Sequence, residues 1–278
     1  MPAYLQPKTL DEAFEYLARE GETRIFAGGT DLIVLMRDGV IRPHALVDVK
    51  ALPELQGIEI DNNKLVIGAA ATCGDLIASS CVSDSCLLLK QAALTLANSL
   101  LRNRATLVGN LCNASPGADM APAALVLQGV LTAVSPEGAR EIALKDFFVG
   151  VKKHVLKANE IVTKISFPVN KGRGIYLKKR RIRGHDLAQV GVAGFHDEDG
   201  IFRLALGAVA ITPLLLDDFG CLSASDLALE KADIAKEAVE AAKPISDVRA
   251  SSDYRLAMVK LFTERIVDAL AMGREVEQ

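Results

Sequence analysis

The pattern of apolar and polar positions predicts a mixture of short helices and strands in the first part of the chain. Thr9 and Glu12 form a capping box that satisfies amide donors, and apolar residues recur at helical spacing after it. A short buried strand is predicted at residues 24–27. The glycine turn at 28–29 follows, and then a helix at 32–37. The first organised unit is therefore strand, glycine turn, helix.

Further apolar runs indicate that mixed elements continue to about residue 167. The turn-forming residues Asp61, Asn62 and Asn63 join two apolar runs and predict a hairpin. Asp146 to Phe148 is expected to form a short helical turn or a loop. The remaining predicted elements are strands at 45–49, 130–134 and 160–167 and a helix at 85–97.

A short segment rich in proline, asparagine and glycine, residues 168–174, predicts a domain boundary near residue 170. The chain then divides into residues 1–169 and residues 170–278. Helical spacing of apolar residues begins at Ser225 and continues to Met272. Before that helical part, an antiparallel sheet is predicted from three runs near residues 174–182, 188–196 and 201–212.

Composition agrees with a folded chain of two domains. The protein has 278 residues, of which 50% are hydrophobic and 24% charged, a balance that supports a buried core and argues against disorder. Lys and Arg number 32 against 35 Asp and Glu, so the net charge of -3 gives no general attraction to nucleic acid or anionic membranes. We therefore expect neither of those partners.

Neither a membrane span nor a targeting segment is evident in the sequence. The most apolar stretch, residues 204–216, has 13 residues and includes Pro213, whereas a spanning helix needs about 20. The N-terminus has no basic region followed by an apolar segment, so a cytoplasmic protein is expected. The five cysteines are an odd number without a C-x-x-C pair, which disfavours disulfides and a zinc site and predicts reduced thiols.

The first segment with candidate chemistry is Ala27-Gly-Gly-Thr-Asp-Leu32. A strand that runs into a glycine turn exposes successive backbone amides, which suit a pyrophosphate. The Thr30 hydroxyl and the start of the following helix add a donor and partial positive charge. The spacing is neither that of a Rossmann turn nor that of a P-loop. By itself the segment is weak evidence for a ligand, because a glycine pair between a strand and a helix is often only a tight turn.

The second segment is the long run of small and polar residues at 104–122, which we expect to be a functional loop. Its asparagines, together with Ser115, offer donors and acceptors for sugar or ribityl hydroxyls. Gly109 allows close backbone approach, and Asp119 can accept from a pair of hydroxyls. The plain alternative is a turn in which Asp119 is the N-cap of a helix at 119–128.

Together these segments resemble the flavin-binding subunit of the molybdenum hydroxylases, a group that includes the medium subunits of xanthine, carbon monoxide and nicotinate dehydrogenases. Ala27-Gly-Gly-Thr-Asp-Leu32 resembles the first FAD loop of that family. The run Ala105-Thr-Leu-Val-Gly-Asn-Leu-Cys-Asn-Ala-Ser-Pro-Gly-Ala-Asp-Met120 resembles the second, usually T-I-G-G-N followed by A-S-P and an Asp. One glycine of the usual pair is Val108 here. Residues 178–190, 206–213 and 247–255 are similar to the family's C-terminal flavoprotein domain.

The resemblance implies an α+β fold and a set of residues that hold FAD. The expected architecture is a two-lobed FAD-binding domain of the vanillyl-alcohol oxidase type, followed by a three-stranded antiparallel sheet with a helical bundle. The implied cofactor-binding residues are Ala27, Gly28, Gly29, Thr30, Asp31, Leu32, Thr106, Gly109, Asn110, Asn113, Ala118, Asp119, Val162 and Lys178.

Two of these residues have specific implied roles. Val162 matches an apolar position that contacts the flavin in relatives. Lys178 matches a lysine near the ring, where a cation favours electron density on the reduced flavin. The alternative for Lys178 is one charge in the basic run 178–183, on a solvated strand face or at a partner contact.

The resemblance also implies a role in electron transfer. In the family, a molybdopterin-containing large subunit hydroxylates the substrate, and a small subunit carries two [2Fe-2S] clusters. FAD on the medium subunit then passes the electrons to NAD or another acceptor. This chain has no iron–sulfur motif, because its cysteines are irregularly spaced, and its four histidines are dispersed without a local nucleophile. FAD is therefore the expected redox group, and we expect no metal ligands and no catalytic acid or base.

Two other functions stay open on the sequence alone. The first is a stand-alone FAD oxidase or reductase, against which the lack of a catalytic His or Tyr counts. The second is an assembly subunit that has lost its flavin, for which Val108 is the support. The sequence does not identify the substrate of the complex, its electron acceptor, its stoichiometry or the surface that docks the iron–sulfur subunit.

Overall fold

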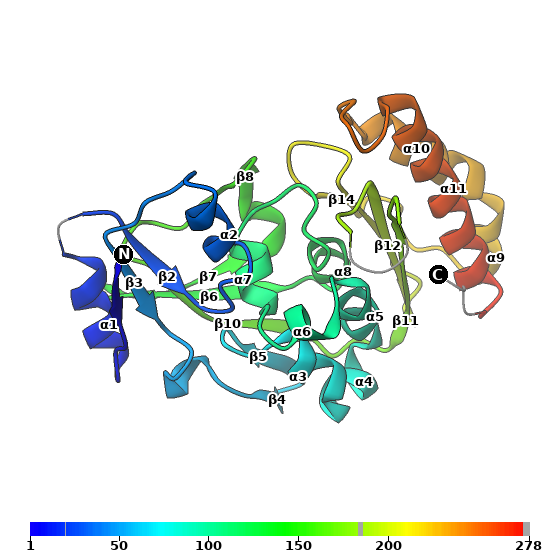
Figure 1. Cartoon of the computed structure of the whole chain (residues 1–278). Helices are drawn as coiled ribbons and strands as arrows, with labels where there is room; N and C mark the ends of the chain where they lie inside the picture. The colour runs from blue at the N-terminus through cyan, green and yellow to red at the C-terminus, as the bar shows by residue number, and fades with distance from the viewer. Residues whose placement is uncertain (20, 183–185, 275–278) are drawn as a thin grey trace.

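The computed structural model of the protein describes residues 1–19, 21–182 and 186–274. In these residues the strands form sheets of three, five, four and two strands. The three larger sheets follow one another across the molecule, and the last helices cover the outer side of the last sheet (Figure 1). The result is a mixed fold of helices and sheets.

The first sheet is parallel, with the order β1-β3-β2. Its strands are β1 (Ala3–Leu5), β2 (Thr23–Phe26) and β3 (Ala45–Asp48), and its helices are α1 (Leu10–Leu17) and α2 (Leu32–Arg37). The prediction that the strand near residue 24 is buried is wrong, since Arg24 and Ile25 are exposed. The reason is that β2 lies at an edge of this small sheet, while the central strand β3 is buried along its whole length.

The N-terminal cap of α1 is formed as predicted on one side only. The Thr9 hydroxyl accepts the amide of Glu12. The Glu12 carboxylate accepts the amide of Lys8, one residue before the cap, at 2.7 Å. The hydroxyl and the carboxylate therefore each satisfy one amide near the start of the helix. The carboxylate of Glu12 does not bond the amide of Thr9, as a full capping box would require.

The second sheet is antiparallel, with the order β4-β5-β10-β6-β7. Its strands are β4 (Ile58–Asp61), β5 (Lys64–Gly68), β6 (Val130–Ser135), β7 (Gly138–Ala143) and β10 (Ile161–Pro168). The predicted hairpin is confirmed: β4 and β5 pair across a turn in which Asn62 and Asn63 have φ of 46° and 59°. Asparagine tolerates this left-handed conformation better than most residues, which explains its place there.

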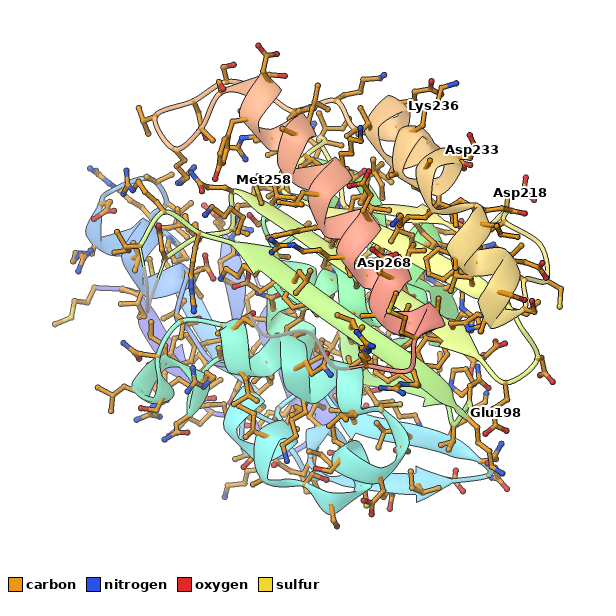
Figure 2. The ribbon with its side chains drawn as sticks, turned by 90° about the vertical axis from the view of Figure 1, so that its right-hand side faces the viewer. Glu198, Asp218, Asp233, Lys236, Met258 and Asp268 are labelled. Carbon is orange, nitrogen blue, oxygen red and sulfur yellow. The ribbon has the colours of Figure 1, made fainter. Side chains whose placement is uncertain are left out.

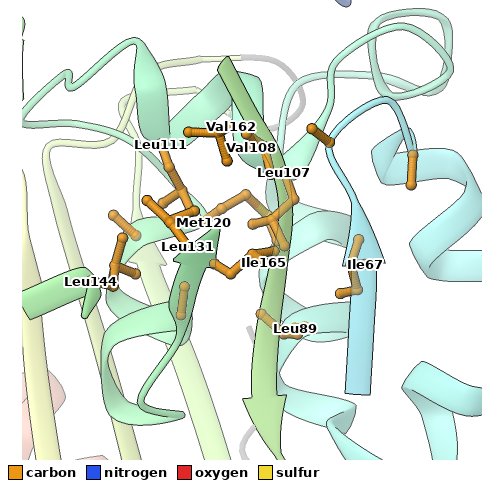
Figure 3. Packing of buried hydrophobic residues seen from close by; sticks show 14 of the residues in the cluster. Ile67, Leu89, Leu107, Val108, Leu111, Met120, Leu131, Leu144, Val162 and Ile165 are labelled. Atoms are coloured by element: carbon orange, nitrogen blue, oxygen red, sulfur yellow. The ribbon is translucent and has the colours of Figure 1, made fainter. Parts of the chain in front are cut away.

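Short helices connect β5 to β6, and a small hairpin precedes β10. The helices are α3 (Cys73–Ala78), α4 (Ser80–Ser85), α5 (Leu87–Thr95), α6 (Ser99–Arg102), α7 (Leu107–Cys112) and α8 (Ala121–Val126). Single 3-10 turns occur at Pro53–Leu55 and Leu144–Asp146, and the small hairpin consists of β8 (Phe148–Gly150) and β9 (Lys153–His154). Apolar residues of β5, β6 and β10 pack with those of α7 in one core cluster (Figure 3).

The third large sheet is antiparallel and has four strands, so the prediction of three strands is wrong. The strands are β11 (Gly172–Lys179), β12 (Val190–Asp197), β13 (Phe202–Gly207) and β14 (Leu214–Leu216). The run at 201–212 was expected to be one strand. It breaks after Gly207 at Ala208, which has a φ of 64°, and the chain returns so that Leu214 pairs with Leu206.

Both faces of this sheet are covered. The C-terminal helices are α9 (Ala224–Leu229), α10 (Lys231–Ala241) and α11 (Ser252–Ala271), and Figure 2 shows α11 lying across the sheet. Ile175 and Leu177 of β11 pack in the same cluster as the helices. Tyr176, between them, belongs to the cluster of the first part of the chain. Successive side chains of β11 point to opposite faces of the sheet. One face therefore packs on the C-terminal helices and the other on the first part of the chain.

Within the described ranges, every helix is too short or too polar to cross a lipid bilayer. The predicted boundary near residue 170 falls in the connection between β10 and β11.

An ion pair between an exposed arginine and a buried glutamate joins the strand β7 to the start of β10. The Arg140 guanidinium donates to both carboxylate oxygens of Glu160, at 2.7 and 2.9 Å, and the amide of Lys157 donates to the same carboxylate. These hydrogen bonds, that of Arg140 first, hold the pKa of Glu160 at about 2, below its ordinary value of 4.5. Because the folded pKa is lowered, the pair stabilises the fold above pH 4.5 and loses this contribution as the pH falls toward 2.

Glu160→Gln is therefore expected to lower the free energy of unfolding at neutral pH and to flatten its dependence on pH between about 5 and 2. Urea unfolding of both proteins across this range measures the difference, which we expect to shrink on acidification. Glu141→Gln on the exposed side of β7 removes a similar charge and serves as the control. Parallel pH profiles of the wild type and Glu160→Gln would contradict the assignment.

Candidate functional site

The two predicted segments lie directly against each other in the structure. A Cβ placed on Gly28 would stand 2.2 Å from the carbonyl oxygen of Arg104 and 3.0 Å from the Cα of Ala105. Both of these neighbours are backbone atoms, which cannot move aside as a flexible side chain can. The glycine turn of the first segment is thus packed on the start of the second, and only glycine allows this approach.

The first segment is a partly exposed turn. Gly29 has a φ of 68°, and a Cβ at this residue would lie 2.4 Å from the ring of Phe26. Asp31 stands at the N-cap of α2 but makes no capping hydrogen bond with its side chain. Its side chain is exposed, whereas Ala27, Gly28, Gly29, Thr30 and Leu32 are half-buried. Backbone amides and one free carboxylate therefore characterise this turn.

The second segment contains a helix, so the prediction of one long loop at 104–122 is wrong. Thr106 is the N-cap of α7, and its hydroxyl accepts the amide of Gly109 at 2.9 Å. Leu107, Val108 and Leu111 are buried in the core cluster (Figure 3). Their spacing matches one face of a helix, which is the physical reason why this part of the run folds.

Two asparagines on the other side of α7 organise the residues that follow it. The Asn110 side-chain oxygen accepts the amide of Met120 at 3.2 Å, and that of Asn113 accepts the ammonium of Lys152 at 2.7 Å. Gly109, Asn110 and Asn113 are half-buried. Because the side-chain oxygens bind protein groups, the amide nitrogens are the donors that each asparagine can offer to a ligand.

Asp119 forms a buried ion pair across the two halves of the chain. Its Oδ2 accepts the Lys178 ammonium at 2.8 Å, and Lys178 also donates to the carbonyl of Thr95 at 3.2 Å. The two side chains are 11% and 2% exposed, so the interpretation of Lys178 as a charge on a solvated strand face is wrong. Asp119 is not the N-cap of the next helix either, because α8 begins after Met120.

The second oxygen of Asp119 has no hydrogen-bond partner among the residues that the structure describes. Its Oδ1 is buried without a hydrogen bond. Burial raises the pKa of Asp119 above its ordinary value of 3.8, although the positive charges of Lys178 and Arg180 act in the opposite direction. A buried acceptor left unpaired costs free energy. This oxygen is therefore suited to accept a hydroxyl of a bound molecule.

The last predicted residues lie in the core. Val162 of β10 is 5% exposed and belongs to the same cluster as Val108 (Figure 3). The register of β10 with β6 shifts between Val162 and Lys164. Ala118 is also buried, at 3% exposure. Arg183 and His185, two members of the basic run and the histidine set, lie outside the described residues.

Sequence reasoning missed Lys152 and Thr95. Lys152, in the turn between β8 and β9, donates its amide to the carbonyl of Ala114 at 2.9 Å and its ammonium to Asn113. Thr95 ends α5 and holds Lys178 through its carbonyl oxygen. A polar turn between two very short strands was the available signal for Lys152. No local pattern marks a carbonyl oxygen such as that of Thr95.

In the part of the chain that the structure describes, no group of three or more His, Cys, Asp or Glu side chains is placed to hold a metal ion. The five cysteines are free, and Cys73, Cys86 and Cys112 have pKa values raised by burial to about 12, 11 and 12.

Comparison with known proteins places these features in context. Residues 1–170 match the family described as FAD binding domain in molybdopterin dehydrogenase. The chain is 31% identical over 280 residues to the carbon monoxide dehydrogenase medium chain of Hydrogenophaga pseudoflava, covering 96% of each. It is 30% identical over 280 residues to the xanthine dehydrogenase FAD-binding subunit of Escherichia coli, covering 95% of this chain and 94% of the relative.

A solved structure extends the similarity to three dimensions. The carbon monoxide dehydrogenase of Hydrogenophaga pseudoflava that lacks the Mo-pyranopterin moiety of its cofactor has a chain that superimposes with a TM-score of 0.89. The two chains are 28% identical, and the match covers 97% of this chain and 96% of the other.

Proposed function

Because this chain belongs to the FAD-binding domain family of the molybdopterin dehydrogenases, we propose that it transfers electrons within a molybdenum hydroxylase complex. It is a FAD-binding medium subunit and an oxidoreductase subunit. The proposed donor is a [2Fe-2S] small subunit, which receives electrons from a molybdopterin-containing large subunit. The proposed acceptor is NAD or another carrier. FAD suits this role because it accepts electrons singly and releases them as a pair.

The observation that carries the proposal is the contact of the two segments at Gly28. The first turn and the residues just before α7 meet there, since the Cβ of any other residue at position 28 would clash with the backbone of Arg104. We assign the pyrophosphate of FAD to residues 27–32. The remaining proposed contacts come from Thr106, Gly109, Asn110, Asn113, Ala118, Asp119, Val162 and Lys178.

Asp119 and Lys178 fit a flavin nucleotide in their chemistry. The unpartnered Oδ1 of Asp119 is an acceptor for a ribityl or ribose hydroxyl. The ammonium of Lys178 is fixed by Asp119 and Thr95 and supplies a buried positive charge beside that acceptor. Val108, the departure from the family's glycine pair, is buried in the core, so its side chain does not add bulk to the exposed side of α7.

The proposal also covers the domains of the chain and its compartment in the cell. Residues 1–169 would be the FAD-binding domain, of the two-lobed vanillyl-alcohol oxidase type. Residues 170–278 would be the C-terminal domain of the carbon monoxide dehydrogenase flavoprotein type. The cytoplasm is the proposed compartment, which the five free thiols support.

Purified full-length protein reconstituted with FAD is expected to be yellow, with the flavin absorption band at about 450 nm. Binding is measured by equilibrium dialysis and by the spectrum after gel filtration, and bovine serum albumin treated in the same way is the control. Anaerobic addition of a reduced [2Fe-2S] protein is then expected to bleach the band, and NAD or another carrier to restore it.

Each alternative predicts a different result. Protein that stays colourless despite excess FAD would overturn the proposal in favour of a flavin-free assembly subunit. Yellow protein that turns over a small organic substrate without any partner would favour a stand-alone oxidoreductase.

A further inference from the structure

The hairpin of β8 and β9 reaches the second segment of the site through Lys152. The Lys152 amide donates to the carbonyl of Ala114 at 2.9 Å, and its ammonium donates to Asn113 at 2.7 Å. Asn113 is the C-cap of α7, and Figure 1 shows β8 near this helix. The hairpin is thus attached to the site by both main chain and side chain.

The backbone of Lys152 has an unfavourable conformation. Its φ is 57°, in the left-handed region that residues other than Gly, Asn and Asp rarely adopt. Glycine would relieve this strain. A side chain held in this conformation is a reason to ask what it contacts.

The polar groups that act on Lys152 come from both segments. Asn113, on the second segment, holds the ammonium by a hydrogen bond. Desolvation lowers the pKa of Lys152 below its ordinary value, and the negative charge of Asp31, on the first segment, partly opposes this lowering. The ammonium therefore lies within electrostatic range of the first segment while bonded to the second.

A diphosphate on the amides of the first segment would bring negative charge close to the exposed carboxylate of Asp31. Repulsion between these anions weakens binding, and a nearby cation offsets it. The ammonium of Lys152 can supply that cation, because the hydrogen bond to Asn113 uses only part of its donor capacity.

We propose that Lys152, in the turn between β8 and β9, is a phosphate-binding residue that contacts the diphosphate of the dinucleotide. This inference rests on the FAD binding proposed above. A charge-assisted hydrogen bond to phosphate is stronger than a neutral one. The ligand class is a nucleoside diphosphate ester, and flavin without phosphate would not use the contact.

The test uses the full-length protein with Lys152→Gly and, as control, Lys153→Gln. Glycine adopts the φ of 57° readily, so this substitution removes the ammonium without straining the fold. Lys153 is the exposed next residue, and its substitution removes the same charge one position away. Dissociation constants are measured for FAD and riboflavin by fluorescence quenching, and for ADP by competition with FAD. Urea unfolding of the apoprotein reports on the fold.

We expect Lys152→Gly to weaken the binding of FAD and ADP by about tenfold to a hundredfold and to leave the affinity for riboflavin unchanged. The urea midpoint should stay the same or rise. Lys153→Gln should bind all three as the wild type does. Unchanged FAD affinity in Lys152→Gly, or equal weakening of FAD and riboflavin, would overturn this inference alone. A wild-type protein that binds no FAD would instead overturn the proposed function, and this inference with it.

Discussion

Replacing Gly28 by valine is expected to abolish the retention of FAD, with a loss of affinity above about a hundredfold. The Cβ alone would stand 2.2 Å from the carbonyl oxygen of Arg104, a distance at which the backbones must move apart. The two segments of the site would separate, and the methyl groups of valine would cover the amides between them. FAD content after gel filtration and the dissociation constant of the reconstituted protein measure the effect.

The matched control is Gly150→Val. Gly150 lies on β8 and does not have a positive φ, and a Cβ there would meet its nearest neighbour at 3.8 Å, an ordinary contact. We expect this variant to retain FAD. Gly28→Ala separates bulk from backbone clash, since alanine adds the Cβ alone and is still expected to lose most of the flavin. Wild-type flavin content in Gly28→Val would refute the assignment of the first segment.

Lys178→Met is expected to destabilise the protein by about 3–5 kcal/mol, because it leaves Asp119 charged, buried and unpaired. The free energy of unfolding from urea titration measures the loss. The double variant Lys178→Met with Asp119→Leu removes both charges and should recover most of it, since buried ion pairs contribute little over apolar residues of similar size. Lys231→Met, which breaks the partly exposed pair with Asp268, should shift the urea midpoint far less.

The loss of unfolding free energy in Lys178→Met, called the deficit below, should also depend on pH. Burial raises the folded pKa of Asp119 above 3.8, and loss of Lys178 removes an attraction that counters this rise. A group with a raised folded pKa favours folding when it is protonated, so the deficit should shrink as the pH falls toward 3.8. A deficit independent of pH, or a double variant no better than the single one, would contradict the role assigned to the pair.

Local patterns in the sequence predicted most of the secondary structure. The cap at Thr9, the glycine turn at 28–29 and the Asp61 to Asn63 hairpin depend on neighbouring residues only. The structure has the turn and the hairpin, and it has the Thr9 half of the predicted capping box. Errors arose where a neighbour in space decides the outcome. The strand at residue 24 is exposed because it lies at the edge of its sheet, and the fourth strand β14 forms after the chain turns back beyond Ala208.

The two motifs of the site, and with them the family, were determined by the sequence, because glycine turns and capped helices are encoded within a few residues. Only the tertiary structure decided what those motifs contact. Lys178 meets Asp119 from 59 positions away, and Lys152 reaches Asn113 from 39. Such pairs form only after the sheets have packed, and no periodicity along the chain records which distant side chain then faces a buried carboxylate.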